Sequence, residues 1–80
     1  MYLEALGIYE EISRYSSKPN NRARALLFMG TTYSLYLDMY DAALQQFENV
    51  IKVYPDSPTA PEALFNGGVV FYKKGEFKRA

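Results

Sequence analysis

Residues 26–55 read LLFMGTTYSLYLDMYDAALQQFENVIKVYP. Within this stretch, apolar side chains recur every three or four positions on both sides of a short connection around Asp38. Such spacing places them on one face of an α-helix, because a helix completes a turn every 3.6 residues. The stretch therefore predicts two amphipathic helices joined by a tight turn, and Pro55 marks the end of the second.

The same spacing extends towards both ends of the chain, and proline interrupts it only in two clusters of turn-forming residues. No stretch shows the sustained alternation of a strand. We expect an all-α fold with helices near residues 2–15, 22–36, 39–54 and 60–74, and a fifth helix starting at Glu76 after a helix end at Gly75. Asp38 is expected to cap the third helix, and Thr59 the fourth, with Glu62 completing a capping box.

Composition excludes several kinds of chemistry. The chain has 80 residues, no Cys and no His, so it cannot form disulfides, Cys/His zinc sites or a histidine acid–base pair. Its carboxylates fall at expected helix ends and polar faces, and we therefore expect no catalytic residue, no metal and no cofactor. Nine basic residues balance nine acidic ones, which disfavours nucleic acid as a partner. No apolar run is long enough for direct membrane insertion.

An internal repeat becomes visible when the sequence is shifted by 38 positions. The pairs that coincide are Tyr2/Tyr40, Ala5/Ala43, Leu6/Leu44, Tyr9/Phe47, Ile12/Val50, Leu26/Leu64, Gly30/Gly68 and Tyr33/Phe71. A period between 20 and 50 residues is typical of solenoids, in which each helix pair buries its apolar face against its neighbours. We therefore expect an antiparallel helix-pair solenoid.

The ordered residues resemble the tetratricopeptide repeat. One copy is Leu26-x2-Met29-Gly30-x2-Tyr33, then Tyr40-x2-Ala43-x3-Phe47 and Pro55; the second is Leu64-x2-Gly67-Gly68-x2-Phe71, then Gly75-Glu76-Phe77-x2-Ala80. The resemblance covers essentially the whole chain and implies a right-handed superhelix of about two repeats, out of phase with the chain ends. The period exceeds the usual 34 residues, and the turn glycine usual in the family is missing from residues 34–37.

A narrower resemblance concerns the linker Tyr54–Ala63. It looks like the linkers of bacterial cell-envelope members of the family, such as the periplasmic coordinator of the Tol-Pal system and the outer-membrane assembly lipoprotein. This resemblance favours a periplasmic or cell-envelope location slightly over the cytoplasm.

The family resemblance also implies a binding site. In this family the first helix of each pair lines a concave groove that takes an extended peptide or a partner helix. The positions that match are Arg24, Leu27, Phe28, Thr31, Ser34 and Leu35 in the second helix, and Glu62, Phe65, Asn66, Val69, Tyr72 and Lys73 in the fourth. Asn66 matches an asparagine that hydrogen-bonds a ligand's backbone, a task that suits an amide with both donor and acceptor. Phe28, Phe65 and Tyr72 are either hydrophobic anchors or packing residues between helices.

Lys73, Lys74, Lys78 and Arg79 form a basic cluster, which is either a set of helix-end charges or a patch for an acidic partner.

The leading interpretation is a non-catalytic protein–protein interaction module, part of a larger bacterial scaffold or envelope protein. An alternative is a self-assembling module, since the chain is expected to begin in the second helix of one pair and to expose the faces Tyr2-Leu6-Tyr9 and Phe71-Phe77. These faces are expected to drive homo-oligomerisation or helix exchange. An appendage that regulates an enzyme domain is a third interpretation.

Overall fold

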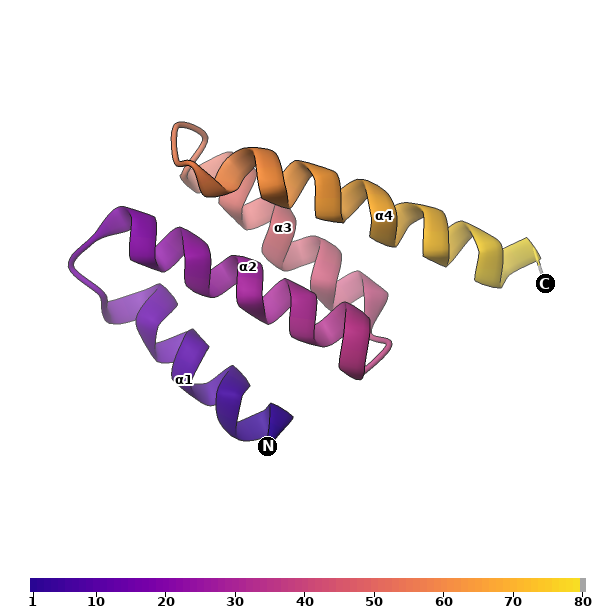
Figure 1. The fold of residues 1–80 in the computed structure, drawn as a ribbon, viewed down its shortest axis with the longest axis horizontal. Helices are drawn as coiled ribbons and strands as arrows, with labels where there is room; N and C mark the ends of the chain where they lie inside the picture. Colours follow the sequence, from indigo (N-terminus) through magenta and orange to yellow (C-terminus); the bar gives the residue numbers. More distant parts are fainter. Residues whose placement is uncertain (80) are drawn as a thin grey trace.

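The computed structural model describes the backbone of residues 1–79 and the side chains of residues 1–75. It contains the helices α1 (Tyr2–Tyr15), α2 (Pro19–Tyr36), α3 (Tyr40–Val53) and α4 (Thr59–Arg79), and no strand within residues 1–79. Consecutive helices run antiparallel in a thin slab of 44 × 29 × 13 Å (Figure 1). Helix α1 packs on α2 alone, whereas α2, α3 and α4 pack on one another. The predicted all-α helical-repeat fold is confirmed.

Helix α1 has the predicted bounds, whereas the starts of α2, α3 and α4 differ from those predicted by one to three residues. Helix α2 begins at Pro19, because the first turn of a helix does not need the amide hydrogen that proline lacks. Helix α3 begins after Met39 and has no side-chain cap, so the prediction that Asp38 caps it is wrong. Helix α4 begins at Thr59, which places this residue within the helix rather than ahead of it as its cap.

Asp38 forms the turn between α2 and α3 instead. Its φ of 51° makes it the one non-glycine residue in the left-handed region among the described residues, a conformation that aspartate tolerates better than most. The Met39 amide donates to the Tyr33 carbonyl over 2.9 Å and closes the end of α2. The Tyr40 hydroxyl donates to Asp38 Oδ1 over 3.4 Å. Partial burial and, after it, the Asp38 carboxylate raise the pKa of this hydroxyl above its ordinary value of 10.0.

The predicted helix end at Gly75 is absent. Helix α4 continues through Gly75 to Arg79, and no described glycine has a positive φ. A glycine weakens a helix but ends it only when it adopts the left-handed conformation, and Glu, Phe, Lys and Arg follow it without a further turn-forming residue. Residues 76–79 therefore extend α4 and do not start a separate fifth helix. The predicted roles of Phe77, Lys78, Arg79 and Ala80 side chains lie outside the described residues.

The core is built around Phe47, which is 2% exposed. The buried residues packed with it are Ala23, Leu27, Ala43, Val50, Ala60, Ala63 and Val70. A Cβ atom added at Gly30 would lie 2.5 Å from Phe47 Cε1, so the ring occupies the space of the missing side chain. The absence of a side chain at Gly30 thus lets α2 and α3 approach closely, and Ala43 is fully buried in the same core.

We predict that Gly30→Ala destabilises the chain. The added methyl group overlaps the Phe47 ring, and overpacking of a core costs about 1–3 kcal/mol, which exceeds the gain in helix propensity. Gly7→Ala is the matched control, since α1 leaves the space around Gly7 open. Urea unfolding followed by circular dichroism should show a lower free energy of unfolding for Gly30→Ala only. A stability equal to that of Gly7→Ala would contradict the role of the Phe47–Gly30 contact.

We also predict that Asp38→Gly raises the free energy of unfolding by about 0.5–1 kcal/mol, because glycine adopts a positive φ without steric cost. Asp38→Ala should lower it, since alanine is strained at a positive φ. Both variants lose the long, exposed hydrogen bond from Tyr40, so the difference between them reports the backbone conformation. The expected stability order is Gly, then Asp, then Ala in the same urea experiment. A reversed order would show that the turn does not need the left-handed conformation.

Candidate functional site

A shallow groove runs between α2 and α4. Its lining residues are Thr31, Ser34 and Leu35 from α2, and Asn66, Val69, Val70 and Lys73 from α4. Its volume is about 100 Å³, below the range of about 300–1,000 Å³ that is usual for small-molecule pockets. We call it the inner groove. It has room for a side chain of an extended peptide rather than for a whole small molecule.

The polar groups of the inner groove differ in what they offer a ligand. The Thr31 hydroxyl donates to the Leu27 carbonyl over 2.9 Å, and the Ser34 hydroxyl donates to the Thr31 carbonyl over 3.2 Å. Both hydroxyl protons are therefore used within α2, and only their oxygen lone pairs face a ligand. The donors that remain are the half-buried Asn66 amide and the Lys73 ammonium group. This combination suits a partner that presents carbonyl or carboxylate oxygens.

The two lysines near the end of α4 have different environments. Lys74 forms an ion pair with Asp41 of α3 and so joins the two helices. No carboxylate among the described side chains lies within ion-pair distance of Lys73, which borders the inner groove. Within residues 1–75, Lys73 therefore differs from Lys74 in having no ion-pair partner.

The positive charge is concentrated on the two groove-forming helices. Up to Gly75, α2 and α4 together carry four basic side chains and one acidic one, whereas α1 and α3 carry five acidic and two basic ones. The zero net charge of the chain therefore conceals a separation between a basic helix pair and an acidic one. A separation of this kind produces a local field that favours a partner of negative charge.

The structure brings together six of the twelve residues expected to line the groove: Thr31, Ser34, Leu35, Asn66, Val69 and Lys73. Leu27 requires a correction, because it is 7% exposed and belongs to the core rather than to the groove surface. Sequence reasoning missed Val70, which helps to line the groove although its side chain is 3% exposed. The signal that could have found it is its spacing, because Val70 follows Asn66 by four residues and such positions share one face of a helix.

Arg24 and Phe28 lie in a different cleft, between α1 and α2. The guanidinium of Arg24 lies 5.7 Å from the centre of the Phe28 ring, and the Tyr9 and Phe28 rings are 5.3 Å apart. The cleft has a volume of about 540 Å³, and Tyr9, Ile12, Tyr15, Arg24 and Phe28 are among its lining residues. We call it the aromatic cleft. The inner groove and the aromatic cleft share no lining residue.

Phe65 and Tyr72 project from α4 and line neither of these two depressions. They are 72% and 69% exposed, and they lie seven residues apart, which places them on one side of the helix. Packing between the helices of this chain is therefore not their role. A partner that extends beyond the inner groove would meet them.

The described residues hold no group of three or more Asp or Glu side chains arranged to bind a metal ion. None of the helices described is long and apolar enough to cross a membrane.

Comparison with protein families gives a match for the central part of the chain. Residues 23–57 match the tetratricopeptide repeat. The matched segment extends from Ala23 through all of α3 to Ser57, so it includes the crossing of Gly30 with Phe47. This match supports the predicted resemblance to the family. Searches of curated proteins and of solved structures gave no match.

Tetratricopeptide repeats generally mediate protein–protein interactions and are typically non-catalytic. The match thus indicates a protein as the partner. The part of the inner groove contributed by α2 lies within the matched segment, whereas Asn66, Val69 and Lys73 follow it.

We predict that Leu27→Ala lowers the free energy of unfolding by about 2–4 kcal/mol, because it leaves a cavity in the core. Phe65→Ala should change the free energy of unfolding by less than about 0.5 kcal/mol, since most of the ring already faces solvent. Thermal or urea unfolding of the two variants checks this. Equal effects would mean that Leu27 is not a core residue.

Proposed function

We propose that this chain is a non-catalytic protein–protein interaction module that binds an extended, acidic peptide segment in the inner groove. The proposal is supported by the presence in one groove of the Asn66 amide and of Lys73, which has no ion-pair partner among the side chains of residues 1–75, on two helices with excess positive charge. Asn66 would donate to a peptide carbonyl, and Lys73 would bind a carboxylate. Phe65 and Tyr72 would contact apolar side chains further along the peptide.

The size of the inner groove favours an extended peptide over a partner helix. A helix has a diameter of about 10–12 Å with its side chains and needs a wide apolar channel. The inner groove combines a volume of about 100 Å³ with hydroxyl, amide and ammonium groups, and it offers only Leu35, Val69 and Val70 as apolar contacts. The linker Tyr54–Ala63 supports a wider context, in which the module belongs to a larger bacterial scaffold or cell-envelope protein.

The test uses peptides selected from a phage-displayed library of random sequences. We expect Asp and Glu to be enriched among them. Fluorescence anisotropy should show that Asn66→Ala weakens binding by about three- to tenfold, because the loss of one hydrogen bond lowers the binding free energy by about 1 kcal/mol. Lys73→Gln should weaken binding and flatten its dependence on salt concentration.

Gln45→Ala is the control, because this amide lies on an exposed side of α3 away from the inner groove. Selected peptides that bind the wild type, Asn66→Ala and Lys73→Gln with equal affinity would overturn the assignment of the groove. Selection of basic peptides would overturn the proposed charge of the partner.

A further inference from the structure

Two slots that share no lining residue with the inner groove or the aromatic cleft have matching residues at a spacing of 38. The first, which we call the three-helix slot, includes Glu10, Arg14, Leu26 and Tyr33, and α3 closes it with Gln46 and Asn49. The second, the two-helix slot, contains the equivalent residues Glu48, Lys52, Leu64 and Phe71 from α3 and α4. Its lining includes no residue of a third helix among those described, and its volume is about 350 Å³.

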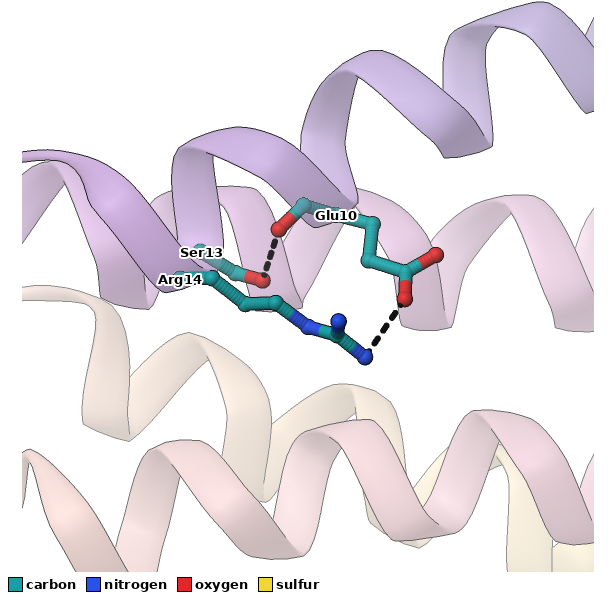
Figure 2. A network of polar contacts seen from close by, with 3 residues as sticks. All are labelled: Glu10, Ser13 and Arg14. Atoms are coloured by element: carbon teal, nitrogen blue, oxygen red, sulfur yellow. Dashed lines mark hydrogen bonds and ion pairs between the residues drawn. The ribbon is translucent and has the colours of Figure 1, made fainter.

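The polar rim is repeated as well. Figure 2 shows the Arg14 guanidinium and the Glu10 carboxylate pointing towards each other on α1, and the two groups form an ion pair of 2.7 Å. The Ser13 hydroxyl donates a hydrogen bond to the Glu10 carbonyl. Lys52 and Glu48 form the equivalent pair on α3 at 2.6 Å. Both pairs are exposed and contribute little to stability. The two pairs lie at equivalent positions of the repeat, so they show that the two slots have the same structural environment.

The exposure of the apolar residues shows what the third helix does. Met29 is 6% exposed in the three-helix slot, where Leu26 and Tyr33 are partly buried. In the two-helix slot Leu64 is 66% exposed and Phe71 is 65% exposed. Two large apolar side chains beside a buried alanine and two glycines form a surface that a helix can cover.

The two equivalent glycines give the sharpest contrast. A Cβ atom added at Gly30 would collide with the Phe47 ring of α3, whereas one added at Gly68 would have no heavy atom within 4 Å. No residue among those described gives a packing reason for glycine at this position, and glycine costs a helix interior about 1 kcal/mol relative to alanine. A ring from outside the chain would give Gly68 the role that Gly30 has.

Helix α1 carries the residues that would supply such a ring. It repeats the α3 pattern, with Ala5, Tyr9 and Ile12 at the positions of Ala43, Phe47 and Val50. These three α3 residues are at most 2% exposed, whereas Ile12 is 37% exposed and Tyr9 is half-buried. The α1 face that corresponds to the α2-facing side of α3 is therefore open.

The aromatic cleft lies on this open side of α1. Three of its lining residues, Tyr9, Ile12 and Phe28, correspond to Phe47, Val50 and Asn66 at the 38-residue spacing. In this chain α2 covers Phe47 and packs beside Asn66. The helix that corresponds to α2 at this spacing is α4. One copy of the chain thus has a cleft that fits α4 of another copy, and it also has a slot that fits α1 of another copy.

We propose that α1 of a second copy of this chain occupies the two-helix slot, antiparallel to α4, with its Tyr9 ring over Gly68. The contact reproduces between copies the packing of α3 against α2 within one copy. It uses faces other than the inner groove, so it is independent of the proposed peptide binding.

Charge supports the antiparallel direction. Helix α1 has Glu4 in its first turn and Arg14 in its last, and α4 has Glu62 in its first turn and Lys73 and Lys74 near its end. Antiparallel docking brings Arg14 to the Glu62 end and Glu4 to the lysine end, so unlike charges meet at both ends. The two faces are different surfaces of one chain, so the contact is head-to-tail and can add further copies.

Sedimentation velocity of the chain over micromolar to millimolar concentrations tests the proposal, with Gly68→Ala and Gly7→Ala as matched variants. Neither substitution meets a heavy atom within 4 Å, so both keep the fold of the single chain. We expect the average mass of the wild type and of Gly7→Ala to increase with concentration. The association constant of Gly68→Ala should be lower by about tenfold or more. A monomer at all concentrations, or equal association of all three proteins, would overturn the proposal.

Cysteine cross-linking tests the direction of the contact, because the chain has no cysteine of its own. Tyr9→Cys and Gly68→Cys, mixed under mild oxidation, should form a disulfide-linked heterodimer, while each variant alone should not. Gly7→Cys mixed with Gly68→Cys is the control that should remain unlinked. Efficient linkage of Tyr9→Cys with itself would show a symmetric α1–α1 contact and would refute head-to-tail docking.

Discussion

The Phe47 ring is the contact on which the arrangement of the helices depends. It lies against Gly30 of α2 so closely that a methyl group has no room there. On its other side, Gly67 of α4 would place a Cβ atom 3.8 Å from Phe47 Cβ, an ordinary contact distance. One ring therefore sets the distances of α3 from both α2 and α4. Since α2 and α4 are the walls of the inner groove, its width follows from this packing.

The two proposed interactions use surfaces of the slab that differ in charge and in packing. The inner groove has polar groups and a basic helix pair, which suit a peptide with carboxylates. The two-helix slot and the aromatic cleft are mainly apolar and suit helices. The α2 and α4 helices contribute to both kinds of surface because successive residues of a helix point in different directions. The proposed peptide site and the proposed contact between copies therefore do not compete for the same residues.

Much of the fold could be predicted from the sequence because it depends on local spacing. The helical periodicity, the 38-residue repeat and the small residue at Gly30 are properties of residue order. The wrong predictions concern features that residue order alone does not determine, such as the burial of a side chain or the end of a helix. Leu27 has the spacing of a groove residue, yet α3 and α4 bury it. Gly75 has the composition of a helix end, yet α4 continues through it, since nothing in the tertiary structure requires a turn there.

The sequence by itself determined the helix pairs and the residues that allow them to cross, because periodicity and side-chain size act within a few turns of helix. Only the tertiary structure decided which of the candidate residues share a surface: it joined Thr31 with Asn66 and Lys73, and it placed Arg24 and Phe28 elsewhere. Gly30 and Gly68 are equivalent in the sequence pattern. They differ in the structure because a helix lies beside the first and none of the described residues approaches the second.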